Sequence, residues 1–232
     1  MLSLNLDVDE KSAVAAAVAA YEKGDFEKAF GLFSELAGQG DADAKAWLAA
    51  MYANGEGVAA SLSQAVGLYR EAAAAGNVLA QANLGAMLAM GQGVAADQAE
   101  GARWLTEAAE QGALFAQYNL ATLYSKGEGI PADHELAAKW YRAAAEAGHY
   151  PSQARLGYLY INGIGVEKNR VEAFVWLSLA AQHGVGNALS ALEAVVSQMS
   201  ADEKHQGAAL VEAWRSRTPE ASLHARLRRN PV

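Results

Sequence analysis

The sequence predicts an all-α protein, a right-handed α-solenoid of about twelve helices arranged as stacked αα-hairpins. One reason is composition: 54 of the 232 residues are alanine, which costs less side-chain entropy in a helix than any other residue. The other is a 36-residue period, in which glycine recurs at Gly40, Gly76, Gly112, Gly148 and Gly184 and a leucine follows each by eight residues. Periods of this length are typical of helical repeats, whose hairpins bury their apolar faces only by stacking.

The first helix of each repeat is expected shortly after the opening glycine. In the third copy Ala116, Leu120, Leu123 and Tyr124 fall on one face of a helix. A Gly-x-Gly pair follows in all four copies, and a glycine can adopt the left-handed conformation of a helix C-cap without strain. We therefore expect the pair to end this helix. It does not indicate a phosphate site, because no Lys-Ser/Thr follows it.

The second helix of each repeat is expected to begin at a residue that favours the N-cap position. These residues, with the side chains that would complete a capping box, are Ser61 with Gln64, Asp97 with Glu100, Asn169 with Glu172, and Asp133 alone. Each second helix carries Leu68, Trp104, Trp140 or Trp176, which we place in the core. Small residues should allow the two helices to approach closely; they are Ala49, Gly85, Ala121 and Gly157 in the first helices and Ala65, Gly101, Ala137 and Ala173 in the second.

The predicted organisation is one helical-repeat domain over residues 1–217. An atypical half repeat covers 9–39, four repeats cover 40–75, 76–111, 112–147 and 148–183, and a C-terminal cap covers 184–217. In the cap, Ser200 and Glu203 form a capping box that opens a last helix. Residues 218–232 are expected to form a basic, disordered tail. From Trp214 onward the charge is +4, so the remainder of the chain carries −12.

Composition excludes several classes of function. The absence of cysteine rules out disulfide scaffolds, thiolate zinc sites and cysteine nucleophiles. A net charge of −8 argues against nucleic acid as the main partner. No stretch reads as a signal peptide or approaches the ~20 apolar residues of a membrane span. We therefore expect a soluble cytoplasmic protein, or a periplasmic one if a signal peptide has been removed.

The third copy carries a resemblance to a known family. Residues 116–124 read Ala-Gln-Tyr-Asn-Leu-Ala-Thr-Leu-Tyr, and Gly127, Gly129, Asp133 and Trp140 follow. This pattern resembles the Sel1-like repeat, a branch of the tetratricopeptide-repeat superfamily with a longer loop between its helices, and the match extends over residues 40–184. Residues 21–29 are similar to an ordinary tetratricopeptide repeat. The resemblance implies an adaptor or scaffold in signalling or complex assembly, often in bacteria.

The resemblance also implies where a partner would bind, because ligands in the superfamily usually lie on the concave face lined by the first helices. That face falls three, six, ten, thirteen and fourteen residues after each opening glycine. It is small in the first two copies, as at Ala46 and Ala82, and large in the last two. Aromatic groups beside amides and one guanidinium suit a peptide or a partner protein. The predicted partner-binding residues are Met90, Phe115, Tyr118, Thr122, Lys126, Tyr158 and Ile161, flanked by Asn83, Asn119 and Arg155.

The sequence leaves two alternatives to partner binding open. One is a structural protein that associates with itself through its end caps or this face. The remote one is a cell-wall-active or β-lactamase-like hydrolase, a label given to some secreted relatives with paired cysteines, which this chain lacks. Its five histidines form no zinc motif, and no catalytic grouping stands out. We expect no enzyme activity, no cofactor and no metal, and no small-molecule substrate.

Overall fold

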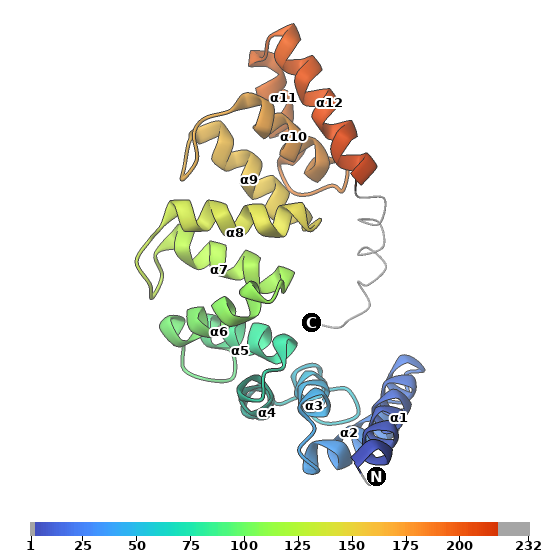
Figure 1. The fold of residues 1–232 in the computed structure, drawn as a ribbon. Helices are drawn as coiled ribbons and strands as arrows, with labels where there is room; N and C mark the ends of the chain where they lie inside the picture. Colours follow the sequence, from blue (N-terminus) through green and yellow to red (C-terminus); the bar gives the residue numbers. More distant parts are fainter. Residues whose placement is uncertain (1–2, 218–232) are drawn as a thin grey trace. The chain divides into compact units, whose positions relative to one another are not determined.

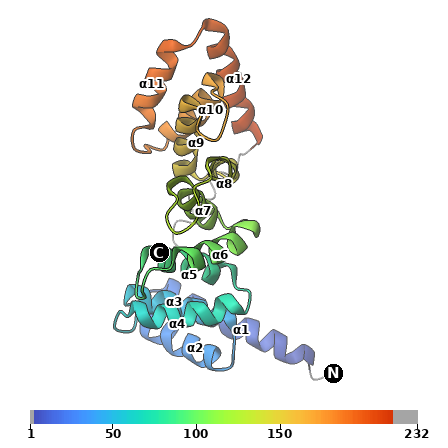
Figure 2. The same cartoon turned by 90° about the vertical axis from the view of Figure 1, so that its left-hand side faces the viewer.

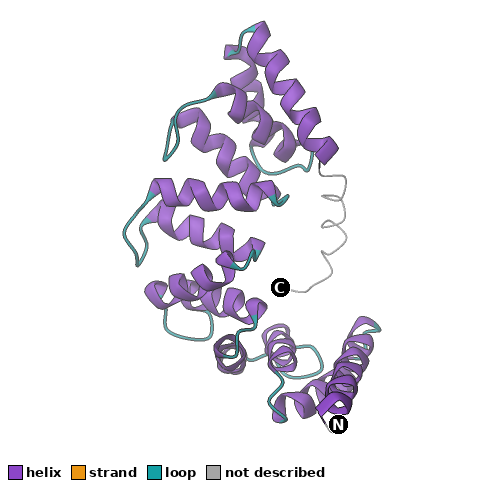
Figure 3. Ribbon diagram, in the orientation of Figure 1, coloured by secondary structure: helices purple, strands orange, loops and turns teal. Residues whose placement is uncertain are grey.

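The computed structural model describes residues 3–217, and within this range it contains twelve α-helices and no strand (Figures 1 and 3). The all-α prediction and the number of helices are therefore confirmed. The helices group into two compact units, one ending at Ala113 and the other beginning at Leu114. Residues 218–232, for which we predict disorder, lie outside the described residues. No helix in the described part of the chain has the length and apolarity needed to cross a bilayer.

The first unit contains three hairpins. Their helices are α1 (Ser3–Glu22), α2 (Phe26–Gly38), α3 (Ala42–Asn54), α4 (Leu62–Ala74), α5 (Val78–Met90) and α6 (Gln98–Glu110). The N-terminal hairpin has the short connection that its resemblance to an ordinary tetratricopeptide repeat implies, whereas α3–α4 and α5–α6 are joined by the longer Gly-x-Gly loop.

The second unit contains two further hairpins and the C-terminal cap. Its helices are α7 (Leu114–Lys126), α8 (His134–Glu146), α9 (Tyr150–Asn162), α10 (Arg170–Ala181), α11 (Ala188–Gln198) and α12 (Ala201–Arg217). The long α7–α8 and α9–α10 connections lie along the same edge of this unit (Figure 3). In the cap, α10 packs against both α11 and α12 (Figure 2).

The leucine eight residues after each opening glycine forms the core of the four repeats, as the period predicts. Leu84, Leu120 and Leu156 are fully buried between helices. Of the second-helix residues placed in the core, Trp176 is buried, whereas Leu68, Trp104 and Trp140 are only partly buried and pack against the core. At the close approach of α5 and α6, a Cβ added to Gly85 would lie 2.7 Å from Leu105 Cγ and 2.9 Å from the Gly101 carbonyl oxygen. Larger side chains at these columns would push the two helices apart, which explains why alanine and glycine occupy them.

One part of the predicted open face is buried instead. Ala46 and Ala82, both six residues after an opening glycine, are only 2% and 7% exposed. Ala46 belongs to the core that also contains Leu84 and Tyr69. Stacking of successive hairpins therefore covers a wider stripe of each first helix than the pattern of a single helix indicates.

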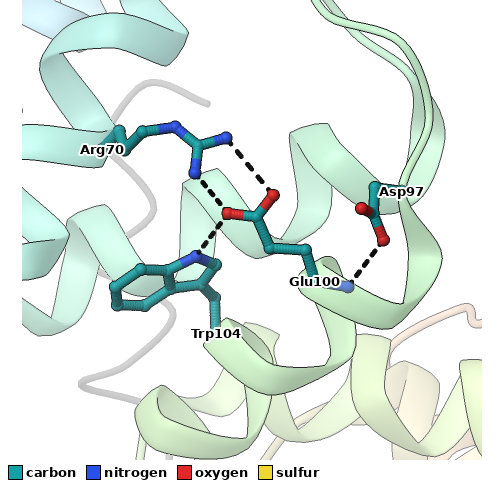
Figure 4. Close-up of polar contacts among 4 residues, drawn as sticks. All are labelled: Arg70, Asp97, Glu100 and Trp104. Carbon is teal, nitrogen blue, oxygen red and sulfur yellow. Dashed lines mark hydrogen bonds and ion pairs between the residues drawn. The ribbon is translucent and has the colours of Figure 1, made fainter.

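The N-caps are confirmed, but three predicted capping boxes form only by half. The side chains of Ser61, Asp97, Asp133 and Asn169 each accept a hydrogen bond from the backbone N–H three residues later. The return bond to the N-cap N–H is pre-empted, because that N–H donates to a first-helix carbonyl, as Asp97 N does to Leu88 O at 2.9 Å. The Glu100 carboxylate instead accepts the indole N–H of Trp104 (Figure 4). The Glu172 carboxylate accepts that of Trp176 in the same way. The box of Ser200 and Glu203, by contrast, makes both of its hydrogen bonds.

The Gly-x-Gly pairs end the first helices as predicted. Gly91 has a φ of 69°, the left-handed conformation of a C-cap. The second position of the pair also requires glycine for lack of space, because a Cβ on Gly93 would lie 2.5 Å from the carbonyl carbon of Leu62, at the start of α4. The pair therefore both caps a helix and lets the loop pack against the preceding hairpin.

Candidate functional site

Large exposed side chains gather on one side of α7 and α9 in the second unit. We define the α7–α9 face by Phe115, Tyr118, Asn119, Thr122 and Lys126 of α7 and Arg155 and Tyr158 of α9. Phe115 and Tyr158 are 62% and 52% exposed, which is unusual for aromatic residues in a folded protein. Both rings are therefore available to a partner without rearrangement of the core.

Aromatic contacts connect α7 to the start of α9. The His149 ring, immediately before α9, packs edge-on against Phe115 and Tyr118, with ring centroids 5.7 and 5.0 Å apart. Tyr118 also contacts Tyr141 of α8 at 5.8 Å. Edge-to-face pairs at such distances stabilise each other beyond simple burial. The exposed Phe115 ring thus sits on a fixed aromatic support, which reduces the entropy lost when a partner binds.

Polar groups beside these rings are held in place as well. The Thr122 hydroxyl lies 3.0 Å from the Tyr141 hydroxyl and also donates to the Tyr118 carbonyl at 2.9 Å. Burial raises the pKa of Tyr141, and the hydrogen bond with Thr122 and the nearby charge of Arg155 partly offset that rise. Arg155 is exposed and forms no ion pair among the described residues. Its guanidinium is therefore available to an acidic group of a ligand.

The helices of the α7–α9 face carry basic residues and no acidic ones. Neither α7 nor α9 contains an aspartate or glutamate, and their charged residues are Lys126 and Arg155. Lys126 makes a long ion pair, 3.5 Å, with Glu128 in the following loop, where both side chains are exposed. In a chain of net charge −8, two helices without acidic residues, one of them carrying an arginine that forms no ion pair among the described residues, favour an anionic partner.

The other predicted site residues belong to the first unit or are partly engaged within the fold of the second. Asn83 and Met90 belong to α5 of the first unit, where Met90 is exposed and Asn83 partly offsets the rise in the pKa of Tyr69 that burial causes. Ile161 packs partly against the α9–α10 core. Asn119 and Tyr118 are half-buried. Of the ten predicted residues, Phe115, Lys126, Arg155 and Tyr158 are those that the second unit presents to solvent.

Sequence reasoning missed Tyr141 and His149. Tyr141 is on a second helix, whereas the predicted face was drawn from the first helices, and His149 immediately precedes α9. The signal available in the sequence was position: Tyr141 stands where the first copy has Tyr69, while the copies between and after have Leu105 and Leu177. Within the part of the chain that the structure describes, no cluster of three or more His, Asp or Glu residues could hold a metal ion.

A family model for the Sel1 repeat matches residues 15–41, 42–77, 78–112, 114–149 and 151–185. The first segment covers the C-terminal part of α1 and all of α2, and so includes residues 21–29, which resemble an ordinary tetratricopeptide repeat. The other four segments follow the predicted repeats with their limits moved by up to three residues. In the comparison with curated proteins, no significant match was found.

Solved structures of bacterial repeat proteins share the fold. A protective antigen present in uropathogenic Escherichia coli strains, which displays an SLR fold, is 31% identical, with a TM-score of 0.76 over 88% of this chain and 44% of the other. A Sel1 repeat protein from Oxalobacter formigenes is 38% identical, with a TM-score of 0.66 over 73% of this chain and 49% of the other. The chain thus spans less than half the length of either relative. A Sel1 repeat protein from Klebsiella pneumoniae, 24% identical with a TM-score of 0.54 over 84% of this chain and 97% of the other, shares the fold alone.

Proposed function

Because the chain belongs to the Sel1 repeat family, whose members generally mediate protein–protein interactions and are typically non-enzymatic scaffolds, we propose that it is an adaptor. Its partner segment, a peptide or part of a protein, binds the α7–α9 face. The observation that carries this proposal is the pair of exposed rings, Phe115 and Tyr158, on two helices that lack acidic residues.

The exposed rings would supply most of the affinity. A folded protein gains nothing from leaving large aromatic side chains in water, so two exposed rings on the same face favour a surface that a partner covers. Aromatic anchors in protein interfaces contribute about 2 kcal/mol or more each when a partner buries them fully. Phe115, already supported by His149, meets the requirement for a rigid anchor.

Charge restricts the chemistry of the partner. Arg155, exposed and one helical turn from Tyr158, would pair with a carboxylate, and the absence of acidic residues from α7 and α9 removes competing pairs. Arginine binds carboxylates in a bidentate geometry that also fixes orientation. The partner segment therefore carries an aromatic or aliphatic side chain close to an aspartate or glutamate.

A displayed library of random peptides tests this proposal. Peptides enriched on the native protein should combine an apolar side chain with an acidic residue, and they should bind the double variant Phe115→Ala, Tyr158→Ala at least tenfold more weakly. Leu79→Ala is the matched control, because Leu79 is an exposed apolar residue (49%) at the same repeat position as Phe115 but in the first unit. Enriched peptides that bind the double variant as well as the native protein would rule out the face.

The test replaces Phe115 rather than Tyr118 because Tyr118 packs against Tyr141 and His149. Loss of the Tyr118 ring would change folding and binding together. Self-association remains the competing use of the same face. If light scattering finds a dimer that dissociates on Phe115→Ala or Tyr158→Ala, the partner is a second copy of the chain rather than a foreign peptide.

A further inference from the structure

An arginine–glutamate–tryptophan contact joins two successive hairpins in the first unit (Figure 4). The Arg70 guanidinium of α4 donates to both carboxylate oxygens of Glu100 at the start of α6, through Nη1 to Oε1 and through Nη2 to Oε2 at 3.4 Å. Oε1 of Glu100 also accepts the indole N–H of Trp104 at 3.3 Å. The guanidinium of Arg70 holds the pKa of Glu100 below its usual range. In this unit, Arg70 thus supplies the positive charge that pairs with the Glu100 carboxylate.

The same three residue types recur two repeats later, as Arg142, Glu172 and Trp176. Here the indole N–H of Trp176 still donates to Glu172, at 2.9 Å. Arg142, however, lies over the ring of Tyr160, 5.5 Å from its centroid, and no ion pair or hydrogen bond joins it to Glu172. Tyr160 occupies the position that Leu88 holds in the first unit, and only the tyrosine offers a π-face to a cation. The arginine of the second unit is therefore diverted from the carboxylate.

A hollow of about 370 Å³ adjoins the contact between Glu172 and Trp176, which no arginine of the described residues joins. Its walls come from α8, α10 and the C-terminal cap helix α12: Trp176, Leu210 and Trp214 are its large apolar residues, and Arg142, Glu146 and Glu172 are its charged ones. These three charges sum to −1. Two indole rings beside two carboxylates suit a planar cation, which can stack on an aromatic ring while its N–H groups pair with an acid.

We propose that this hollow is an arginine-binding site and that its occupant is the C-terminal segment of the same chain, residues 218–232. This segment carries Arg226, Arg228 and Arg229. A guanidinium from this segment would pair with the Glu172 carboxylate as the guanidinium of Arg70 pairs with that of Glu100. It would also lie against the indole rings of Trp176 and Trp214.

The position of α12 allows this occupancy. Trp214, which lines the hollow, is three residues before the end of α12 at Arg217, so the following segment starts close to the site. The nine residues from Arg217 to Arg226 can span up to about 30 Å when extended. The segment carries three arginines against Glu220, a charge of +2, whereas the remainder of the chain carries −10, so charge favours docking of the segment on its own protein.

The indole N–H signals in a ¹⁵N-correlated NMR spectrum of the full chain provide the test. The chain has five tryptophans, whose signals are assigned with single Trp→Phe variants. In the triple variant Arg226→Gln, Arg228→Gln, Arg229→Gln, the Trp176 and Trp214 signals should shift and the Trp104 signal should stay in place. Trp104 is the matched control, because its carboxylate partner Glu100 is already paired with Arg70. Glu172→Gln, which preserves an acceptor for the indole, should produce the same shift of Trp214.

Three results would overturn the proposal. One is a triple variant whose Trp176 and Trp214 signals coincide with those of the native chain. Another is a difference between the native chain and the triple variant that disappears when both are diluted, because the segment would then bind a second copy of the chain. The third is native-like spectra when the same arginines are replaced by lysine, because that would reduce the contact to general charge attraction without a guanidinium site.

Discussion

The replacement Leu156→Ala is the sharpest test of the repeat register. Leu156 is 0% exposed and lies in the core of the second unit with Trp176 and Leu177 of α10. The truncation removes three carbon atoms, which at about 0.8 kcal/mol per buried methylene corresponds to ~2.4 kcal/mol of lost transfer free energy. The neighbouring side chains come from a separate helix and cannot fully collapse into the space, so a cavity term adds to this. We expect the free energy of unfolding to fall by about 3–4 kcal/mol.

Urea unfolding followed by circular dichroism measures this change. The control is Tyr158→Ala, two residues along the same helix, where a half-exposed ring is removed instead. It should cost less than about 1 kcal/mol, because exposed side chains contribute little to stability. A loss below about 1 kcal/mol for Leu156→Ala, or equal losses for the two variants, would refute the assignment of Leu156 to the buried stripe of α9.

Three further predictions concern contacts in the first unit. Burial raises the pKa of Tyr69 to about 12, so its contribution to stability is complete below pH 10 and is lost as the pH rises towards 12; Tyr69→Phe should reduce the alkaline fall in urea midpoint, equivalent to about 2–3 kcal/mol. Gly85→Ala should lose about 1–2 kcal/mol in urea unfolding despite the better helix propensity of alanine, because its Cβ would meet Leu105; a stabilised variant would contradict the close helix approach. A double-mutant cycle on Arg70 and Glu100 should give a coupling of about 0.5–1 kcal/mol that weakens in high salt, and no coupling at low salt would contradict the contact.

The helices and their caps could be predicted because each depends on a steric need that returns every 36 residues. Leu120 and Leu156 are buried, and Ser61 and Asp97 cap their helices, as the columns indicate. The open face was harder to predict. Ala46 has the same helical phase as an exposed position, but its burial depends on how much of the helix the neighbouring hairpin covers. The repeat period shows which side of a helix faces the core, but it does not show how many residues around the helix the neighbouring hairpin covers.

Contacts that involve three elements at once were also beyond the sequence. The capping-box pattern is present at Asp97 and Glu100, yet the N-cap N–H is already bonded to Leu88 of the preceding helix, which leaves the carboxylate for Arg70 and Trp104. A local pattern cannot reveal that competition. For the same reason, nothing in the local sequence around Arg142 distinguishes it from Arg70. The difference comes from a tyrosine eighteen residues later, which approaches it only after the hairpins stack.

The repeat itself indicates why the α7–α9 face can be altered without loss of the fold. Ten residues after the opening glycine, the four copies have Ala50, Ala86, Thr122 and Tyr158, whereas eight residues after it all four have leucine. The first position tolerates variation because it is only partly buried in three copies and exposed at Tyr158, while the second is fixed by burial. Tyr158→Ala therefore restores a residue that two other copies already carry at an equivalent place in a folded hairpin. A loss of binding in that variant would therefore result from loss of the aromatic side chain, because two folded hairpins of the same chain already have alanine at this position.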